Sequence, residues 1–218
     1  MMIAINKAHF PVTVLGPGQR LAIWFQGCSI GCKGCVSQDT WPADSSREVA
    51  LADLIDWCRS TTRGALGGVT LSGGEPFDQP EALAALLDEL NRWRSEPGVR
   101  FDILCYSGYP LAHLRRVHPG ILARLDAIIA EPFVENLPVA HVWRGSSNQT
   151  LVPLSALGEE VFGPHVLAPA GSLGKRIQMK LEEGRIWYIG IPERGDMDAL
   201  EAACAEQGVR FASVSWRQ

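Results

Sequence analysis

The sequence predicts an α/β fold, with a mostly parallel sheet and helices packed outside it. Three observations predict this class. Apolar runs of strand length alternate with helical patterns along most of the 218 residues, and such alternation is typical of parallel sheets. The chain is 46% hydrophobic and 20% charged, which excludes a disordered protein. Its length suits one domain or a tight pair, and we expect a single domain over residues 1–218.

The first part of the chain carries the clearest strand and helix signals. Short apolar runs that stop at glycine or polar turn residues predict strands at 21–25, 68–71, 101–106 and 125–130. Helical spacing of apolar residues predicts helices at 46–60, 80–93 and 111–117. Ser45 or Ser46 is a suitable N-cap for the first helix. Pro80 suits the first turn of the second helix, whose leucines form one apolar stripe.

The second part of the chain is less regular. Residues 132–150 show no clear period and predict a loop. Beyond them we predict strands at 177–181 and 185–191 around a turn at 183–184, a helix at 196–207 and a last strand at 209–214. We therefore expect a core over 10–150 and a βαβ-like extension over 151–218. Functional residues should lie in loops at the carboxyl ends of the parallel strands.

Charge and hydropathy exclude several kinds of partner. The chain has 20 Lys and Arg against 24 Asp and Glu, so its net charge is 20 − 24 = −4. Bulk charge therefore does not drive it onto nucleic acid or an anionic membrane. No apolar run approaches the roughly 20 residues that a membrane helix needs, and residues 1–7 lack a signal-peptide pattern. We expect a cytoplasmic protein without a nucleic-acid or membrane partner.

Three of the six cysteines, Cys28, Cys32 and Cys35, form a CxxxCxxC motif. A disulfide scaffold spreads its cysteines along a small chain, whereas one tight group in a cytosolic chain indicates a metal site. Three thiolates at these spacings can hold a [4Fe–4S] cluster and leave one iron open to another ligand. The alternative is a Cys3His zinc site, but no histidine lies at zinc-finger spacing, so we favour the cluster. The candidate histidines are His9, His113, His118, His141 and His165.

The residues around the cysteines resemble a known family. They include Gly16–Arg20 before the first predicted strand, Phe25–Cys28, Thr40-Trp41 and Trp143–Gln149. CxxxCxxC after a strand is the signature of the radical S-adenosylmethionine (SAM) superfamily, and the other segments resemble its glycyl-radical activating enzymes. Within that group the chain is most similar to the activators of anaerobic ribonucleoside-triphosphate reductase. The resemblance covers residues 10–150.

This resemblance implies a fold, two cofactors and two partners. The fold would be an incomplete parallel (β/α)6-type barrel with helices outside. Cys28, Cys32 and Cys35 would hold a [4Fe–4S] cluster, and the amino and carboxylate groups of SAM would chelate its open iron. One electron would then cleave SAM into methionine and a 5′-deoxyadenosyl radical that abstracts hydrogen. The implied partners are a glycyl-radical enzyme, such as anaerobic ribonucleotide reductase, and a flavodoxin- or ferredoxin-like electron donor.

Ser72, Gly73, Gly74 and Glu75 follow the predicted strand 68–71 and are candidates for binding SAM. The glycines allow the backbone to approach a ligand closely, and Glu75 can accept a hydrogen bond from an ammonium group. In the family that the chain resembles, this motif binds the amino group of the methionine portion. A Gly-Gly turn alone is more often structural, but after a CxxxCxxC loop we favour binding.

Three further segments keep two interpretations. Tyr106 and Ser107 end the next strand and resemble a family step near SAM, although a plain strand-to-helix turn explains them equally well. Glu131 stands where family members often carry an aspartate. Residues 144–149 are either a functional loop or a solvated turn. Outside the motif, Cys58, Cys105 and Cys204 are predicted to be small buried apolar residues.

Two features depart from the family. Ser37 stands where the reductase activators usually have asparagine, and 69 residues (218 − 149) follow Gln149, where short activators end. Three functions are therefore weighed: an activase acting on a partner protein, which we favour; a radical SAM enzyme acting on a small metabolite or peptide; and a non-catalytic metal-binding protein. The missing fourth cysteine argues against an electron carrier, and Ser72–Pro76 argues for SAM.

Overall fold

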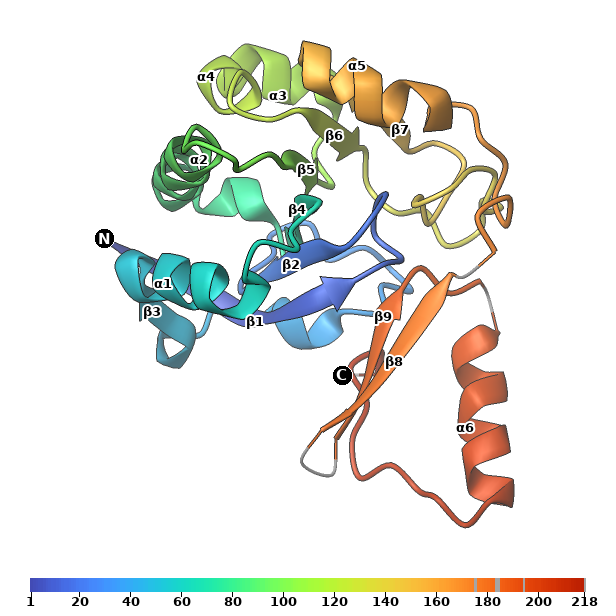
Figure 1. The fold of residues 1–218 in the computed structure, drawn as a ribbon. Coiled ribbons are helices and arrows are strands. Elements are labelled where there is room, and N and C mark those ends of the chain that lie inside the picture. Colours follow the sequence, from blue (N-terminus) through green and yellow to red (C-terminus); the bar gives the residue numbers. More distant parts are fainter. Residues whose placement is uncertain (175, 183–184, 194, 218) are drawn as a thin grey trace.

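A seven-stranded mixed sheet forms the centre of the fold (Figure 1). The computed structural model describes residues 1–174, 176–182, 185–193 and 195–217. The sheet order is β3-β1-β2-β4-β5-β6-β7. β2, β4, β5 and β6 are parallel, whereas β1, β3 and β7 pair antiparallel at the two sides. The strands are β1 (Met2–Val12), β2 (Arg20–Phe25), β3 (Glu48–Ala50), β4 (Gly68–Gly73), β5 (Asp102–Tyr106), β6 (Ala127–Ala130) and β7 (Thr150–Pro153).

The expected α/β class with a mostly parallel sheet is confirmed, but the parallel part has four strands rather than six. The reason lies in the connections on each side. A parallel pair needs a crossover, usually a helix, and neither residues 13–19 nor residues 131–149 form one. β1 and β7 therefore turn back antiparallel. In the described part of the chain, the end strands β3 and β7 do not pair with each other.

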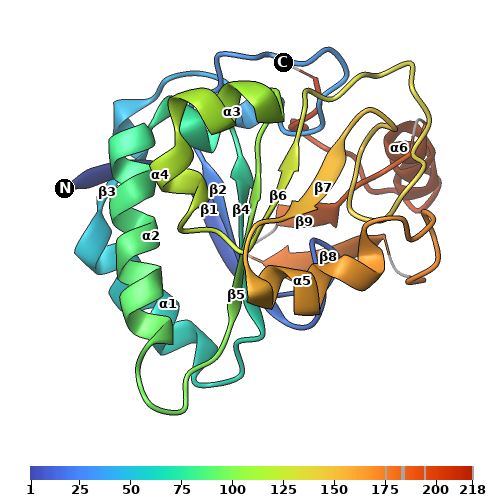
Figure 2. The same cartoon turned by 90° about the horizontal axis from the view of Figure 1, so that it is seen from above.

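Helices and a hairpin cover the two faces of the sheet (Figure 2). Helices α1 to α4 lie on one face; α5 and the hairpin of β8 (Ile177–Glu182) and β9 (Arg185–Gly190) lie on the other. All of β2 is buried, because a strand covered on both sides has no solvated face. The helices are α1 (Leu51–Thr62), α2 (Pro80–Arg94), α3 (Leu111–Val117), α4 (Pro119–Leu122), α5 (Ala156–Phe162) and α6 (Asp196–Glu206).

Most elements predicted for the first part of the chain are confirmed, with one clear error. The helix expected from residue 46 begins at Leu51. Asp44 caps a short 3-10 turn, η2 (Ser45–Arg47), by accepting from the Ser46 N–H, and the next three residues pair with β1 as β3. Five helices and strands of the described chain were not predicted: β1, β3, β7, α4 and α5. Each of the three strands lies at a side of the sheet, where pairing with distant residues decides the structure.

The tail has the predicted hairpin strands and helix, but not the last strand. β8 and β9 pair antiparallel with each other, and α6 follows them. Residues 209–214 form no strand. The segment instead contacts β9 through a side chain, because the Phe211 ring packs edge-on against Tyr188 with centroids 6.4 Å apart. The turn predicted at 183–184 lies outside the described residues. No helix in the described residues is long and apolar enough to cross a membrane.

A buried ion pair fixes the three central strands at their first residues. Arg20, Gly68 and Asp102 stand side by side on β2, β4 and β5. The Arg20 side chain crosses over Gly68 and donates to both carboxylate oxygens of Asp102, at 3.1 and 2.5 Å. A Cβ on Gly68 would lie 2.2 Å from the Arg20 guanidinium. The Gly16–Arg20 segment thus has a structural use, since its arginine also donates to Thr70 Oγ1 at 2.6 Å.

We predict that losing Arg20 alone destabilises the fold more than losing Arg20 and Asp102 together. Replacing Arg20 alone with Met leaves Asp102, 3% exposed, as an unpaired buried charge, which should cost about 3–5 kcal/mol of unfolding free energy. The double variant Arg20→Met, Asp102→Leu should recover most of that loss, because no charge is left unpaired. Urea unfolding of the cluster-free proteins measures both values. A double variant no more stable than Arg20→Met would contradict the prediction.

Candidate functional site

The carboxyl ends of β2, β4 and β5 open onto one cavity of about 120 Å³. This is the sheet edge where parallel strands place their binding loops. All the residues that the sequence predicted for the metal and SAM sites line this cavity, whether or not they bind: Cys28, Cys32, Cys35, Ser72, Gly73, Gly74, Glu75, Tyr106 and Ser107. The rest of the lining consists of Ile30, Trp41, Gly108, Phe133 and Gln149.

The cysteine loop begins at Gly27, directly after β2, and backbone hydrogen bonds hold its start. The Gly27 N–H donates to the Thr40 carbonyl at 2.7 Å, and the Cys28 N–H donates to the Trp41 carbonyl at 3.0 Å. The Gly27 carbonyl accepts from the Glu75 N–H at 2.8 Å. The loop is thereby closed on itself and joined to the loop that follows β4.

Asp78 adds a side-chain connection that the sequence analysis did not find. Its Oδ2 accepts from the Ser29 N–H at 2.6 Å, and its Oδ1 accepts from the Tyr109 hydroxyl at 2.8 Å. Asp78 ends the 3-10 turn η3 (Pro76–Asp78), so it links the loops after β2, β4 and β5. An exposed aspartate three residues after Glu75 carries no spacing signal that marks this role.

The three cysteine thiols have the chemistry that a cluster requires. Burial raises the pKa of each thiol, whereas iron binds the thiolate, so cluster binding must offset this cost. Donors near the sulfurs favour the thiolate. The Ser37 N–H donates to Cys35 Sγ at 3.4 Å, the Trp41 side chain acts to lower the pKa of Cys35, and the Phe133 backbone acts to lower the pKa of Cys32. The sulfurs and the cavity between them fit an iron–sulfur cluster.

A single metal ion fits this cavity less well. Within the described residues, no group of three His, Cys, Asp or Glu side chains is arranged to hold one ion. A cluster places each cysteine on a different iron, so its ligands stand farther apart than the ligands of one zinc ion. The three cysteines line one cavity, as the ligands of one cluster would.

Glu75 is a buried carboxylate, 1% exposed, that joins the loops after β4 and β5. Its Oε1 accepts from the Phe77 N–H at 3.0 Å and from the Ser107 hydroxyl at 2.9 Å. Its Oε2 accepts from the Gly108 N–H at 2.8 Å. Burial raises the pKa of Glu75 to about 7 despite these donors. With one donor, Oε2 keeps a lone pair for a ligand in the cavity.

Gly73 and Gly74 allow the backbone of β4 to contact the cysteine loop. Gly73 has a φ of +101°, and a Cβ there would lie 2.5 Å from the Phe25 nitrogen. A Cβ on Gly74 would lie 2.0 Å from the Gly27 carbonyl oxygen. The sequence predicted close approach to a ligand at these glycines, and the structure gives a second reason for them. They let two protein backbones touch beside Cys28.

Tyr106 and the segment from Trp143 to Gln149 contact each other across the sheet edge. The Tyr106 hydroxyl donates to the Trp143 carbonyl at 2.9 Å. Gln149 holds the segment by accepting from the Gly145 N–H at 2.7 Å and donating to the Glu131 carbonyl at 3.1 Å. Of this group, only Tyr106 and Gln149 line the cavity. Glu131 instead accepts from the Leu111 N–H at the start of α3.

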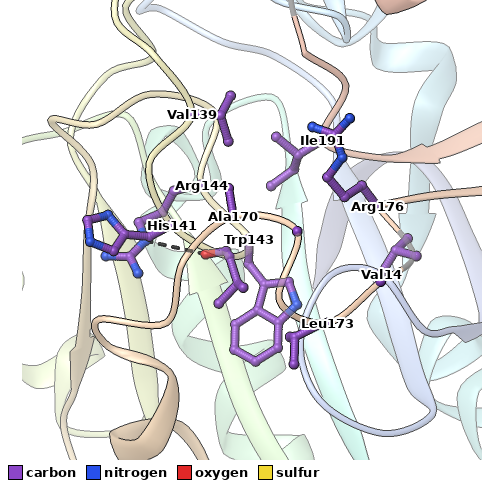
Figure 3. A pocket seen from close by; sticks show the side chains of 12 residues that line it. Val14, Val139, His141, Trp143, Arg144, Ala170, Leu173, Arg176 and Ile191 are labelled. Carbon is purple, nitrogen blue, oxygen red and sulfur yellow. Dashed lines mark hydrogen bonds between the residues drawn. The ribbon is translucent and has the colours of Figure 1, made fainter.

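A second cavity, between the extension and the main sheet, is too small for either cofactor. It measures about 30 Å³, which is room for one or two water molecules. Figure 3 shows its largely apolar wall, with Val14, Trp143, Leu173 and Ile191 around it. The buried Arg144 side chain donates to the Val166 carbonyl at 2.8 Å. Arg144 therefore holds backbone segments together beside this cavity.

Comparisons with known proteins agree with this site. Residues 14–152 match the model of a family described as "4Fe-4S single cluster domain". An anaerobic ribonucleoside-triphosphate reductase-activating protein of Vibrio cholerae is 34% identical over 152 residues, covering 66% of this chain and 94% of the relative. Proteins of the same name from Escherichia coli K12 and Enterobacteria phage T4 are 32% and 29% identical, covering 66% and 63% of this chain and 94% and 86% of each relative. Among solved structures, the crystal structure of QueE from Escherichia coli matches with a TM-score of 0.44 and 20% identity, over 60% of this chain and 70% of QueE.

The chain belongs to the family of anaerobic ribonucleoside-triphosphate reductase-activating proteins. The resemblance drawn from the cysteine motif and its neighbouring segments is thereby confirmed. As a member of this activating-protein family, the chain is an enzyme of the radical SAM type. Its cofactors are a [4Fe–4S] cluster and SAM. The activating-protein relatives leave about a third of this chain unmatched.

We predict that each of the three cysteines is needed for the cluster. Changing Cys28, Cys32 or Cys35 to Ala should abolish the visible absorbance of the anaerobically reconstituted protein and its bound iron, because each cysteine holds a different iron and its loss leaves a second iron without a protein ligand. Cys204→Ala is the matched control, since Cys204 lies on α6 and does not line the cavity. A full cluster in the triple variant would contradict the assignment.

We also predict that Glu75 makes stability depend on pH. Its pKa of about 7 in the folded chain lies above the ordinary 4.5, so the folded state holds the proton more tightly. This stabilising contribution is complete below about pH 4.5 and is lost as the pH rises to about 7. Relative to Glu75→Gln, the unfolding free energy of the cluster-free wild type should fall by roughly 3 kcal/mol across this range. Urea unfolding at each pH measures this free energy for both proteins. If the two plots of unfolding free energy against pH are parallel, the prediction is wrong.

Proposed function

We propose that this chain cleaves SAM reductively and generates a glycyl radical on a partner enzyme, such as anaerobic ribonucleotide reductase. The carrying observation is that the three cysteines share one cavity with the loops after β4 and β5. The names of the relatives, which describe reductase-activating proteins, support the partner. A flavodoxin- or ferredoxin-like protein is the proposed electron donor, and the cytoplasm the proposed location.

In this proposal the thiolates of Cys28, Cys32 and Cys35 hold the cluster. When bound and reduced by the electron donor, the cluster would supply the one electron needed to split SAM into methionine and a 5′-deoxyadenosyl radical. The walls formed by Trp41 and Phe133 would exclude water from the cavity. We assign no residue of the chain beyond the cluster as catalytic.

The remaining predicted residues are proposed to bind SAM. Ser72, Gly73 and Gly74 would offer backbone groups to its methionine portion, and the free lone pair of Glu75 Oε2 would accept from its ammonium group. Tyr106 and Ser107 would complete this wall of the cavity. The same proposal includes a single domain whose four parallel strands correspond to part of an incomplete (β/α)6-type barrel.

A second function is favoured by one specific observation. The family match ends at residue 152, so β8, β9 and α6 lie beyond it. These elements give the chain a surface outside the matched region, and such a surface could belong to a radical SAM enzyme that acts on a small metabolite or peptide. The experiment below separates the two functions by asking whether the reductase loses a hydrogen atom and carries a glycyl radical.

The test combines the reconstituted chain, a chemical reductant, SAM and the anaerobic reductase. We expect 5′-deoxyadenosine together with a protein-centred glycyl radical detected by EPR. Glu75→Gln should weaken SAM binding about ten-fold, through one lost charge-assisted hydrogen bond; Glu81→Gln, on the exposed start of α2, is the matched control. Cleavage of SAM without a radical on the reductase would favour the second function. No cleavage by the cluster-loaded chain would contradict both.

A further inference from the structure

The last residues of the described chain return to the cysteine loop. We name residues 215–217 the C-terminal strap. The Gln38 N–H donates to the Ser215 carbonyl at 2.9 Å, and the Ser215 hydroxyl donates to the Val36 carbonyl at 2.9 Å. The Gln38 side chain donates to the Trp216 carbonyl at 3.1 Å. In Figure 2 the last red segment of the chain accordingly passes beside the blue loop that follows β2.

The C-terminal strap is itself fixed to the extension. The Trp216 indole donates to Glu201 on α6 at 2.9 Å, and its ring packs edge-on against Tyr188 of β9 with centroids 6.3 Å apart. Arg217 pairs with Asp198 at 2.7 Å and with Glu201 at 3.0 Å. The strap is therefore held in place by β9 and α6.

The extension is in turn attached to the main sheet. Ile189 of β9 is 3% exposed and packs with Val12 and Trp24. Gln178 of β8 donates to the Pro11 carbonyl at 2.7 Å and accepts from the Thr13 N–H at 3.0 Å. A continuous path of contacts thus runs from the sheet, through the hairpin and α6, to the strap.

The strap contacts the part of the cysteine loop that carries a donor to sulfur. Val36, Ser37 and Gln38 directly follow Cys35, and the Ser37 N–H donates to Cys35 Sγ at 3.4 Å. The Ser37 carbonyl accepts from the Thr40 hydroxyl at 2.6 Å. The strap bonds the residues on both sides of Ser37, so it restricts the orientation of this donor.

We propose that the C-terminal strap is a positioning device that holds the Cys35 side of the cluster site and slows loss of the cluster. The proposal rests on the proposed cluster ligands. The strap and the residues that anchor it, Tyr188, Asp198 and Glu201, all lie beyond residue 152, where the family match ends. Hydrogen bonds to ligand sulfurs stabilise a cluster and tune its potential, so fixing the Ser37 N–H should matter most when iron dissociates.

Two variants remove the strap to different degrees. One ends the chain after Val214, and the other, Trp216→Ala, keeps the backbone but removes the bonds to Glu201 and Tyr188. Trp57→Ala is the matched control, because Trp57 lies on α1, is partly exposed and does not line the cluster cavity. Each variant is first reconstituted anaerobically, and its iron content is measured.

Cluster loss to an iron chelator is then followed by visible absorbance. We expect about ten-fold faster loss in the shortened chain, since strap hydrogen bonds of modest net strength are lost together. Trp216→Ala should be intermediate, and Trp57→Ala should match the wild type. The midpoint potential of the cluster should also shift in the shortened chain. Loss at the wild-type rate with an unchanged potential would overturn the proposal.

Hydrogen exchange on the cluster-free proteins separates failure of the strap from failure of the cluster assignment. The Gln38 amide should exchange faster in both strap variants, because its acceptor is the Ser215 carbonyl. Amides of β4 and β5 should keep wild-type protection, which shows that the sheet is folded. If the Gln38 amide exchanges at the wild-type rate in both variants, the proposed role of the strap is wrong. A wild-type chain that takes up no iron overturns the proposed cluster site, and with it the proposed role of the strap.

Discussion

The buried pair of Arg20 and Asp102 sets the register on which the site depends. It joins the first residues of β2 and β5 across Gly68, whose missing side chain leaves room for the guanidinium. A shift of one residue between neighbouring strands would turn every side chain to the opposite face. With the first residues aligned, the three strands also end together, and the loops that carry Cys28, Gly74 and Ser107 start from one edge.

At that edge the loops are held by direct contact rather than by bulky side chains. Gly74 lies against the Gly27 carbonyl, and the Glu75 carboxylate accepts from Ser107 and Gly108. Glycine lets two backbone segments approach each other, and a buried carboxylate supplies acceptors for N–H groups that would otherwise be unpaired. The same features that suit a ligand also organise the protein, so mutations at Glu75 or Gly74 act on both.

The grouping of the candidate residues around one cavity was predictable from the sequence, because its signals are local. The spacing of the cysteines and the Gly-Gly-Glu step lie within short segments, and the strand alternation placed them on one edge. Features that depend on distant pairing were not predictable. β3 replaces the start of the expected helix because it pairs with β1. Residues 209–214 do not join the two-stranded sheet of β8 and β9, and Asp78 bonds residues far from it in sequence. The contact of Ser215 with Val36 spans 179 positions, which no pattern within either segment indicates.

That long separation has a consequence for the order in which the protein is made. The ribosome synthesises the cysteine loop early, whereas the segment that bonds it emerges 179 positions later. Domains generally fold as units once their residues are available, from the N-terminal end first. A nascent chain can therefore present its three thiols long before the contacts around Cys35 are complete. Iron delivered during translation would meet an open loop, and iron delivered after translation would meet a closed one.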